Sequence, residues 1–483
     1  MNVIKFLSSN HCDRLPTVRV SHIKIVNVKD VKSGTIDFAC SKYFVEEGTQ
    51  SDILGIYGQN GSGKTTLIQV LEIIKRLLSG KRMSPHVIDL ITVGAETSLI
   101  EIHFDFQYPN GDIRDISYSF EIGKQPITDD IKKTIKRFDK SPFKNYEFVT
   151  LVFNEKVGCS GVFNGKKLKK QPLIEVDANG VYSPTTKVDT FFDDYKNINE
   201  RSLDFIFKKS KLESRSAIFS DTFFSKLKEN TDGNDFAEII KELRLFAEDF
   251  LFVSTSEANT PVRGNFCLPF FSEKGVFYFN TDEPTIVTAD FFDEIQNEVA
   301  QISSVLCKWV PGLELALINV TKTETKEIKD AISFELASKR GDSILPIRYE
   351  ADGVRKIIMY LKLLICAFNQ KSTTVAIDEL DAGVFEFLLG EILELFERHG
   401  KGQLIFTSHN LRPLEVLDKK FLCFTTSNPE NRFVRMKSVG HTNNLRLLYL
   451  KEIMLGGTQD EQLYKKEKEY AILGAIKKCK VFE

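Results

Sequence analysis

Apolar and polar side chains alternate along several segments of the chain, and this pattern predicts β-strands. Residues 18–25 alternate in this way, as do residues 98–107 and 117–122. The last two segments flank residues 109–112, Pro-Asn-Gly-Asp, which are typical of a tight turn and predict a hairpin. Three shorter runs are mostly apolar, as expected for buried strands of a parallel sheet: 52–57, 373–377 and 403–407.

Apolar residues recur at helical spacing between these strands. The predicted helices cover residues 65–78, 237–250, 291–309, 354–368 and 384–398. Strands and helices therefore alternate at both ends of the chain, which favours an α/β fold.

The middle of the chain has a different character, because helical patterns predominate in residues 185–312. No sustained heptad runs through this segment, so it is predicted to be a compact insertion and not a long coiled coil. The prediction divides the chain into a strand-rich N-terminal lobe (1–184), a mainly helical insertion (185–312), a C-terminal lobe (313–440) and a helical tail (441–483). The Lys- and Glu-rich tail is either a solvated helix or an assembly contact.

Composition excludes several classes of protein. The 483 residues suffice for about three domain-sized units, and 42% of them are hydrophobic, too many for a disordered chain. The net charge of −2 does not support a protein whose whole surface binds nucleic acid. No apolar run reaches the length of about 18 residues that predicts a membrane helix, and residues 1–13 are unlike a signal peptide. The eight cysteines form no Cys-x-x-Cys pair, which is typical of reduced thiols in a cytoplasmic protein.

The loop after the first buried strand has the pattern of a phosphate-binding loop. The pattern Gly-x-x-x-x-Gly-Lys-Ser/Thr is matched by Gly58, Gln59, Asn60, Gly61, Ser62, Gly63, Lys64 and Thr65, and Thr66 follows. Glycines let backbone N–H groups point at phosphate oxygens, and the helix that follows presents its N-terminal dipole to the anion. In this pattern Lys64 reaches the β- and γ-phosphates and Thr65 ligates Mg²⁺.

Two further buried strands end in residues that suit phosphate chemistry. Asp378 and Glu379 follow the strand at 374–377: the first carboxylate suits the shell of a Mg²⁺ ion, and the second can polarise an attacking water. His409 follows the strand at 403–407. At the carboxyl end of a strand beside a phosphate site, a contact with the γ-phosphate is favoured over a purely structural role.

Residues 349–356 open a predicted helix and permit two interpretations. Asp352 could be an ordinary N-cap. Alternatively, Gly353 and the helix N-terminus bind a phosphate held by a partner subunit.

The order of these motifs resembles that of ABC-type ATPases, with a strand, a phosphate loop, a long insertion, a signature helix, an Asp-Glu strand and a His strand. It is more closely similar to the AAA-family, overcoming-lysogenization-type and Rad50-like ATPases of bacterial antiphage systems. The residues that carry the resemblance are Asp378-Glu-Leu-Asp381-Ala-Gly383, Phe406-Thr-Ser-His409-Asn-Leu-Arg412 and Thr442-Asn-Asn-Leu-Arg446. Within this group the ATPase subunits of PARIS systems are most similar, followed by those of Septu.

The resemblance implies an ABC-type P-loop ATPase head with a mixed sheet, and ATP and Mg²⁺ as substrate and cofactor. It makes Glu379, His409 and Lys64 catalytic, Asp381 part of a D-loop that crosses a dimer interface, and residues 350–356 the signature. The implied nucleotide contacts are the loop from Gly58 to Thr66 together with Asp352, Gly353 and Asp381, and the implied metal ligands are Thr65, Asp378 and Gln107. The chain departs from the family at Ala351, where a Ser would contact the partner's γ-phosphate, and this departure implies slow hydrolysis.

The resemblance also implies partners. ATP would lie between two copies of the chain in a head-to-tail dimer or higher homo-oligomer. The ATPase would act as a sensor or scaffold that sequesters a TOPRIM-type nuclease supplied by another chain and releases it when a phage protein is recognised. The alternative is a DNA-binding repair ATPase without an effector, for which residues 166–170, Lys-Lys-Leu-Lys-Lys, are a candidate contact; a solvated hairpin tip is the favoured interpretation of that run. No membrane partner is expected.

Overall fold

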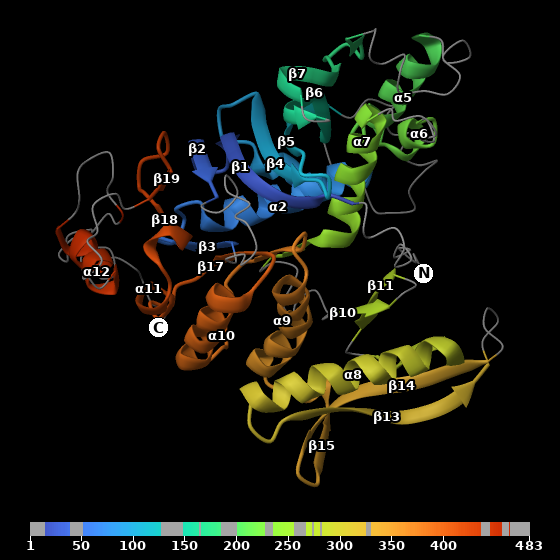
Figure 1. Cartoon of the computed structure of the whole chain (residues 1–483), viewed down its shortest axis with the longest axis vertical. Helices are drawn as coiled ribbons and strands as arrows, with labels where there is room; N and C mark the ends of the chain where they lie inside the picture. Colours follow the sequence, from blue (N-terminus) through green and yellow to red (C-terminus); the bar gives the residue numbers. More distant parts are fainter. Residues whose placement is uncertain are drawn as a thin grey trace, which may run out of the picture.

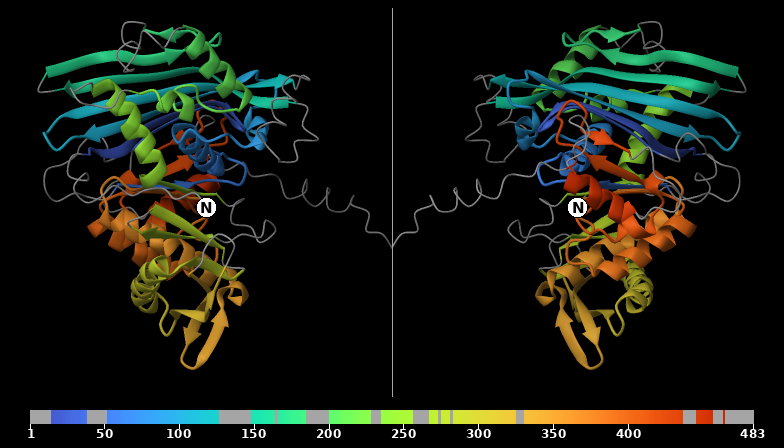
Figure 2. Two further views of the ribbon diagram at one scale, coloured as in Figure 1. Left: turned by 90° about the vertical axis from the view of Figure 1, so that its right-hand side faces the viewer. Right: turned by 90° about the vertical axis from the view of Figure 1, so that its left-hand side faces the viewer.

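The computed structural model is layered, as Figures 1 and 2 show. A broad antiparallel sheet lies at the top of Figure 1, a central sheet with its helices lies below it, and a smaller sheet with one long helix lies at the bottom. The structure describes residues 15–38, 52–126, 148–163, 166–184, 200–227, 235–255, 267–272, 275–280, 283–324, 330–435, 445–455 and 463.

The central sheet positions the candidate site. In the described residues its strand order is β19-β18-β3-β17-β16-β9, and every neighbouring pair is parallel except β18 with β19. The strands are β3 (Asp52–Tyr57), β9 (Leu251–Ser254), β16 (Thr374–Ile377), β17 (Gln403–Thr407), β18 (Leu422–Thr425) and β19 (Phe433–Val434). Every residue of β3, β16 and β17 is buried, so the prediction of buried parallel strands is confirmed.

The upper sheet is the strand-rich lobe, and its order is β2-β1-β4-β5-β6-β7-β8. Its strands are β1 (Thr17–Val28), β2 (Val31–Asp37), β4 (Thr97–Gln107), β5 (Ile113–Pro126), β6 (Phe148–Phe163), β7 (Lys166–Val176) and β8 (Tyr182–Ser183). β4 and β5 pair antiparallel across the turn at 109–112, which confirms the predicted hairpin. Buried residues alternate along β4, so one face of this lobe is apolar.

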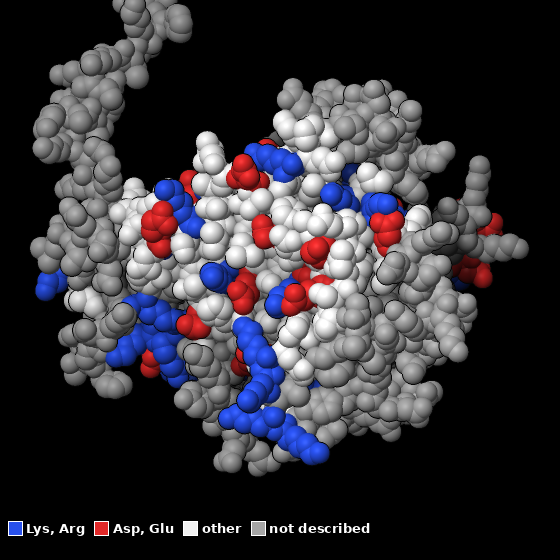
Figure 3. Space-filling view, turned by 90° about the horizontal axis from the view of Figure 1, so that it is seen from above, with Lys and Arg blue, Asp and Glu red and all other residues white. Residues whose placement is uncertain are grey.

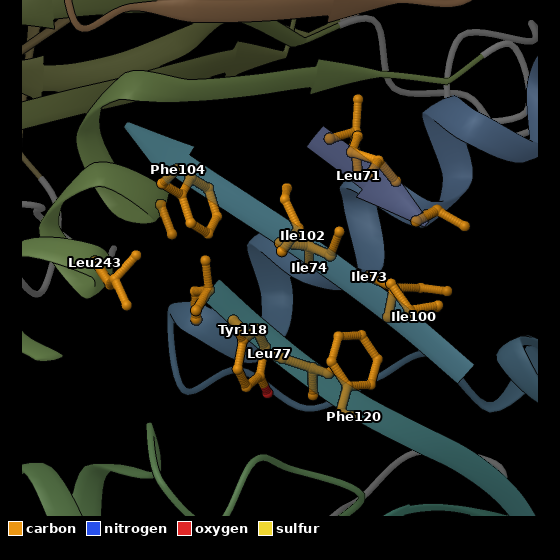
Figure 4. Packing of buried hydrophobic residues seen from close by; sticks show 14 of the residues in the cluster. Leu71, Ile73, Ile74, Leu77, Ile100, Ile102, Phe104, Tyr118, Phe120 and Leu243 are labelled. Carbon is orange, nitrogen blue, oxygen red and sulfur yellow. The ribbon is translucent and has the colours of Figure 1, made fainter. Parts of the chain in front are cut away.

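The helix α2 (Lys64–Leu78) lies between the two sheets and fills this apolar face. Figure 4 shows Ile74 and Leu77 of α2 in one cluster with Ile102 and Tyr118 of the lobe. Each fully buried aliphatic side chain of this kind contributes about 1.5–3 kcal/mol. This packing fixes the position of α2, whose first residue follows the phosphate loop.

The segment 185–312, predicted as an inserted subdomain, contributes elements to more than one layer of the structure. It contains β9, which pairs in parallel with β16 at the edge of the central sheet. Its last helix, α8 (Ala289–Trp309), belongs to the lower layer and shares a hydrophobic cluster with the sheet β12-β14-β13. The other elements of the lower layer are β10 (Cys267–Ser272), β11 (Gly275–Asn280), β12 (Thr285–Thr288), β13 (Glu314–Thr323), β14 (Ala331–Arg340) and β15 (Ser343–Pro346).

The remaining helices cover the sheets. They are α5 (Glu200–Leu212), α6 (Asp221–Phe224), α7 (Asp235–Leu245), α9 (Asp352–Asn369), α10 (Glu386–His399), α11 (Pro413–Val416) and α12 (Leu445–Leu455), with 3-10 turns η1 (Pro85–Leu90), η6 (Ile347–Tyr349) and η7 (Lys419–Phe421) and the π-helical turn η4 (Phe246–Phe250). α12 is the described part of the predicted helical tail; most of the rest of 441–483 lies outside the described residues. Within the described residues, none of the helices has both the length and the apolar composition needed to span a membrane.

Candidate active site

The phosphate loop connects β3 to α2 at the carboxyl edge of the central sheet. Gly61 and Gly63 adopt φ values of 75° and 89°, which favour glycine. A Cβ on Gly58 would lie 1.8 Å from Thr425 Oγ1, so a side chain is excluded there. The hydroxyl of Ser62 bonds to the carbonyl of Gln59 and to the hydroxyl of Thr425, and these contacts hold the loop against β18. Asn60 and Gly61 are exposed at its tip, and Thr66 is buried below it.

Lys64 lies inside the loop. Its Nζ donates hydrogen bonds to the carbonyl oxygens of Gly58 (2.8 Å) and Gln59 (3.0 Å). Burial lowers the pKa of the Lys64 ammonium, and the carboxylates of Asp378, Glu379 and Asp381 oppose this shift. A buried ammonium group in the first turn of a helix is suited to an anion such as a phosphate.

Asp378 joins three elements of the site. Asp378 Oδ1 accepts hydrogen bonds from Thr65 Oγ1 of α2 (3.2 Å) and from Thr407 Oγ1 of β17 (2.6 Å). The Asp378 N–H donates to the carbonyl oxygen of Ser254, at the end of β9 (2.9 Å). The side chain of Asp378 is therefore aimed at the phosphate loop, and the Thr65 and Asp378 oxygens are hard donors of the kind that Mg²⁺ prefers.

Glu379 has a strained backbone. Its φ is 53°, in the left-handed region, which costs about 1–3 kcal/mol for a residue other than glycine. Two bonds stabilise this turn: the Glu379 N–H donates to Thr407 Oγ1 (2.8 Å), and the Leu380 N–H donates to the Thr407 carbonyl (3.1 Å). The half-buried Glu379 side chain leaves the sheet directly beside Asp378.

Asp381 fixes the loop that carries His409. Its Oδ2 accepts from the backbone N–H groups of His409 (3.1 Å) and Asn410 (3.0 Å). The His409 side chain is exposed, and the second oxygen of Asp381 is buried without a hydrogen-bond partner among the described residues. Within one chain, Asp381 thus connects the segment after β16 to the segment after β17.

The predicted signature lies at the start of α9, next to this region. Ala351 is the N-cap and no side chain caps the helix, so the first of the two interpretations, Asp352 as N-cap, does not hold; Asp352 is the exposed first residue of the helix. A Cβ on Gly353 would lie 2.3 Å from the carbonyl oxygen of Gly383, so the two backbones are in direct contact. The first turn of α9 therefore touches the segment that begins with Asp381.

The structure contradicts the prediction that Gln107 is a metal ligand. Gln107 pairs with Thr17 at the far end of β4. The next residue, Val18, donates its N–H to Ser372 Oγ (3.2 Å), just before β16 begins. Asp378 follows the opposite end of β16, and a four-residue strand spans about 13 Å. The residue beside Asp378 is instead Ser254, at the carboxyl end of β9.

Sequence reasoning also missed a contact between the lobe and the loop. A Cβ on Gly63 would lie 2.9 Å from Val31 Cγ2, so the start of β2, directly after the β1–β2 turn, packs on the phosphate loop. Arg432 supports this turn by donating to the carbonyl oxygens of Thr426 and Asp30. Burial lowers the pKa of Arg432, and Asp30 opposes the shift. Arg432 and Asp30 are 402 positions apart in the chain, and no local pattern connects them.

A family model described as "AAA domain, putative AbiEii toxin, Type IV TA system" matches residues 53–415. The chain belongs to this family. It is accordingly an ATPase of the AAA type, and the matched residues run from β3 through the loop, Asp378 and His409 to α11.

Solved structures with some similarity include an SMC head domain from Thermotoga maritima (12% identity, TM-score 0.34, covering 87% of this chain and 100% of that one). Others are an Smc head with a coiled coil and joint from Pyrococcus yayanosii (12%, 0.38, 90% and 99%) and the recombination mediator protein RecF-ATPrS of the RecFOR pathway (12%, 0.35, 88% and 100%). At these scores, the assignment of this P-loop fold rests on the family match and on the strand order. A search of curated proteins found no match.

Proposed function

We propose that this AAA-family chain binds ATP with Mg²⁺ and hydrolyses it slowly as part of a homodimer. The observation that carries the proposal is the hydrogen-bonded set of Thr65, Asp378 and Thr407. This set joins the start of α2, directly after the phosphate loop, to the carboxyl ends of β16 and β17. The residues fit the cofactor, because the Thr65 hydroxyl and the Asp378 carboxylate present oxygen ligands to the same point. When bound, Mg²⁺ would neutralise the charge of the β- and γ-phosphate oxygens.

Three residues of the chain would have separate roles in ATP hydrolysis. Lys64 would exchange its bonds to the Gly58 and Gln59 carbonyls for phosphate oxygens. Glu379 would take a proton from the attacking water, in the position that its turned backbone gives it beside Asp378. His409 would contact the γ-phosphate from a loop held by Asp381.

A second copy of the chain would complete the site with residues 350–356. Exposed aromatic side chains surround this face: Tyr349 is 66% exposed, and Phe385 and Phe387 are 68% and 52% exposed. The rings of Phe385 and Phe387 lie 5.6 Å apart beside the Asp381 segment. Exposed aromatic clusters of this kind are typical of protein interfaces. Ala351 offers no hydroxyl to the partner's nucleotide, which supports a slow rate.

The biological role we propose is a sensor or scaffold in antiphage defence, as the sequence resemblance to PARIS ATPase subunits implies. The family description, which names a putative toxin of a toxin–antitoxin system, supports a defence context. In this proposal a TOPRIM-type nuclease is sequestered by the ATPase and released when a phage protein is recognised. Because the two-fold assembly depends on ATP at the interface, nucleotide turnover would change the subunit packing that holds the effector.

The alternative is a DNA-binding repair ATPase. Lys166, Lys167, Lys169 and Lys170 are exposed on β7. Figure 3 shows groups of Lys and Arg on the face seen from above, where β6 and β7 lie in Figure 1. Binding through such a patch would weaken steeply with salt concentration.

The test compares Glu379→Gln with the wild type. The variant is expected to keep ATP binding, lose turnover by at least about 100-fold and accumulate as a dimer in ATP and Mg²⁺, because general base catalysis supplies about 10²–10⁴-fold. Glu391→Gln, an exposed carboxylate on α10, is the matched control. Normal turnover in Glu379→Gln would refute the assignment. A pull-down with the same variant separates the roles: a retained nuclease supports the defence role, and retained DNA without a protein supports the alternative.

A further inference from the structure

A cavity of about 360 Å³ lies at the amino edge of the central sheet, opposite the edge that carries the phosphate loop. The start of β1, residues 15–18, forms one wall. The loop at 370–372, which connects α9 to β16, forms a second wall, and α7 with the π-helical turn η4 forms the third. The cavity is distinct from the site described above, because β16 separates the 370–372 loop from Asp378.

The cavity wall contains a buried carboxylate with an unused hydrogen-bonding atom. Asp249 is 4% exposed, and its Oδ1 has no hydrogen-bond partner among the described residues. The second acidic residue of the wall, Glu242, accepts a hydrogen bond from the Tyr108 hydroxyl (2.7 Å). Lys371, which is exposed, is the one basic residue of the described wall. The acidic groups of this cavity therefore lie deeper than its cation.

The electrostatics of Asp249 favour a ligand with a positive charge. Burial raises the pKa of the Asp249 carboxyl to about 7; the neighbouring Glu248 raises it further, and Lys75 opposes the shift. A buried carboxylate without a donor is unfavourable, so a ligand that supplies a charged N–H group would stabilise the ionised form. Asp249 also sits on a π-helical turn, and such turns occur frequently at functional sites.

We propose that this cavity binds a small organic amine with an apolar or aromatic body. Its ammonium group would donate to Asp249 Oδ1, and its body would lie against Leu245, Phe246 and Phe250, which line the same cavity. The volume falls within the range of about 300–1,000 Å³ typical of small-molecule pockets. A metal ion fits less well, because the described part of the chain contains no group of three His, Cys, Asp or Glu residues that could hold one.

The proposal concerns a site separate from the phosphate loop, and it does not depend on ATP turnover. The amine would contact the loop at 370–372, which leads from α9 directly into the strand that ends at Asp378. A ligand bound there would stabilise one arrangement of these two elements.

The test is calorimetric titration of the full chain with 2-phenylethylamine, and with 2-phenylethanol as the neutral analogue of the same shape. The amine is expected to bind at least tenfold more tightly than the alcohol. Asp249→Asn, which keeps the shape and removes the charge, is expected to lose at least tenfold in amine affinity. Asp342→Asn, at the exposed β14–β15 turn, is the control and should bind like the wild type.

Equal binding of amine and alcohol, no binding of the amine, or unchanged affinity in Asp249→Asn would overturn the proposal. If Asp249→Asn does not fold, a crystal structure of the wild type with 2-phenylethylamine decides. An ammonium nitrogen within hydrogen-bond distance of Asp249 supports the proposal, and a ligand elsewhere or absent from the cavity refutes it.

Discussion

Thr407 is expected to control the geometry of both carboxylates in the ATPase site, and Thr407→Val tests this. The substitution keeps the shape of a side chain that is 1% exposed and removes the hydroxyl. The hydroxyl makes two contacts, donating to Asp378 Oδ1 at 2.6 Å and accepting from the Glu379 N–H at 2.8 Å. In the variant, Asp378 Oδ1 loses one hydrogen-bond donor, and the Glu379 N–H loses its acceptor.

The magnitude follows from these two contacts. A hydrogen bond to a charged group is worth about 1.5–3 kcal/mol. If that energy is lost in the transition state, at ~1.4 kcal/mol per tenfold in rate, kcat falls about 10- to 100-fold. ATP binding should change much less, because Lys64 and the loop backbone are untouched. The assay is steady-state phosphate release, with nucleotide affinity measured separately by a fluorescent analogue.

The control is Thr374→Val, at the other end of the same sheet. Thr374 is also fully buried, and its hydroxyl donates to Gln403 Oε1 at 2.8 Å. This variant should lose about 0.5–1.5 kcal/mol of stability, typical of a neutral hydrogen bond, and keep its turnover. If both variants turn over ATP at the same rate, the Thr407 hydroxyl has no special role and the reasoning is refuted.

Three further predictions concern the loop, the interface and pH. Gly58→Ala should abolish ATP binding, because its Cβ would lie 1.8 Å from Thr425 Oγ1; an equilibrium binding assay that shows wild-type affinity would contradict the loop geometry. Phe385→Ser should weaken the ATP-dependent dimer at least tenfold in light-scattering titrations, since its exposed ring would be covered by the partner, whereas unchanged dimerisation would exclude this face. Burial, followed by the charge of Asp115, raises the pKa of Asp105 to about 7, so its protonated form favours the fold. The stability that this shift contributes is complete below the ordinary pKa near 4 and is lost as pH rises towards 7 and above. Thermal unfolding of wild type and Asp105→Asn should therefore diverge in favour of the variant between pH 4 and 8, and parallel curves would be inconsistent with this pKa.

Local patterns predicted the parts of the site that are local in the chain. A mostly apolar run, closely spaced glycines and helical periodicity predict the order of β3, loop and α2. This order predicts the positions of Lys64 and Thr65 at the start of the helix. The same kind of pattern predicts the ends of β16 and β17, because the strand ends where the short apolar run ends. The structure then brings Thr65 and Asp378 to 3.2 Å, with β17 between their strands.

The parts that were not predicted depend on contacts between distant segments. β9 follows directly on a helical pattern, and only its pairing with β16 shows that it is a strand of the central sheet. The prediction that Gln107 is a metal ligand failed for the same reason. The sequence of β4 does not show which edge of the central sheet lies near its last residue. Arg432 is joined to Asp30 across 402 positions, beyond the reach of any spacing argument.

The contact between Gly353 and Gly383 has a mechanical consequence. Because the two backbones touch with no side chains between them, neither segment can shift towards the other, and a push on the first turn of α9 displaces the chain beside Asp381. Asp381 in turn holds the backbone of His409 and Asn410. A displacement of the first turn of α9 would thus be transmitted by direct contact to the loop that carries His409.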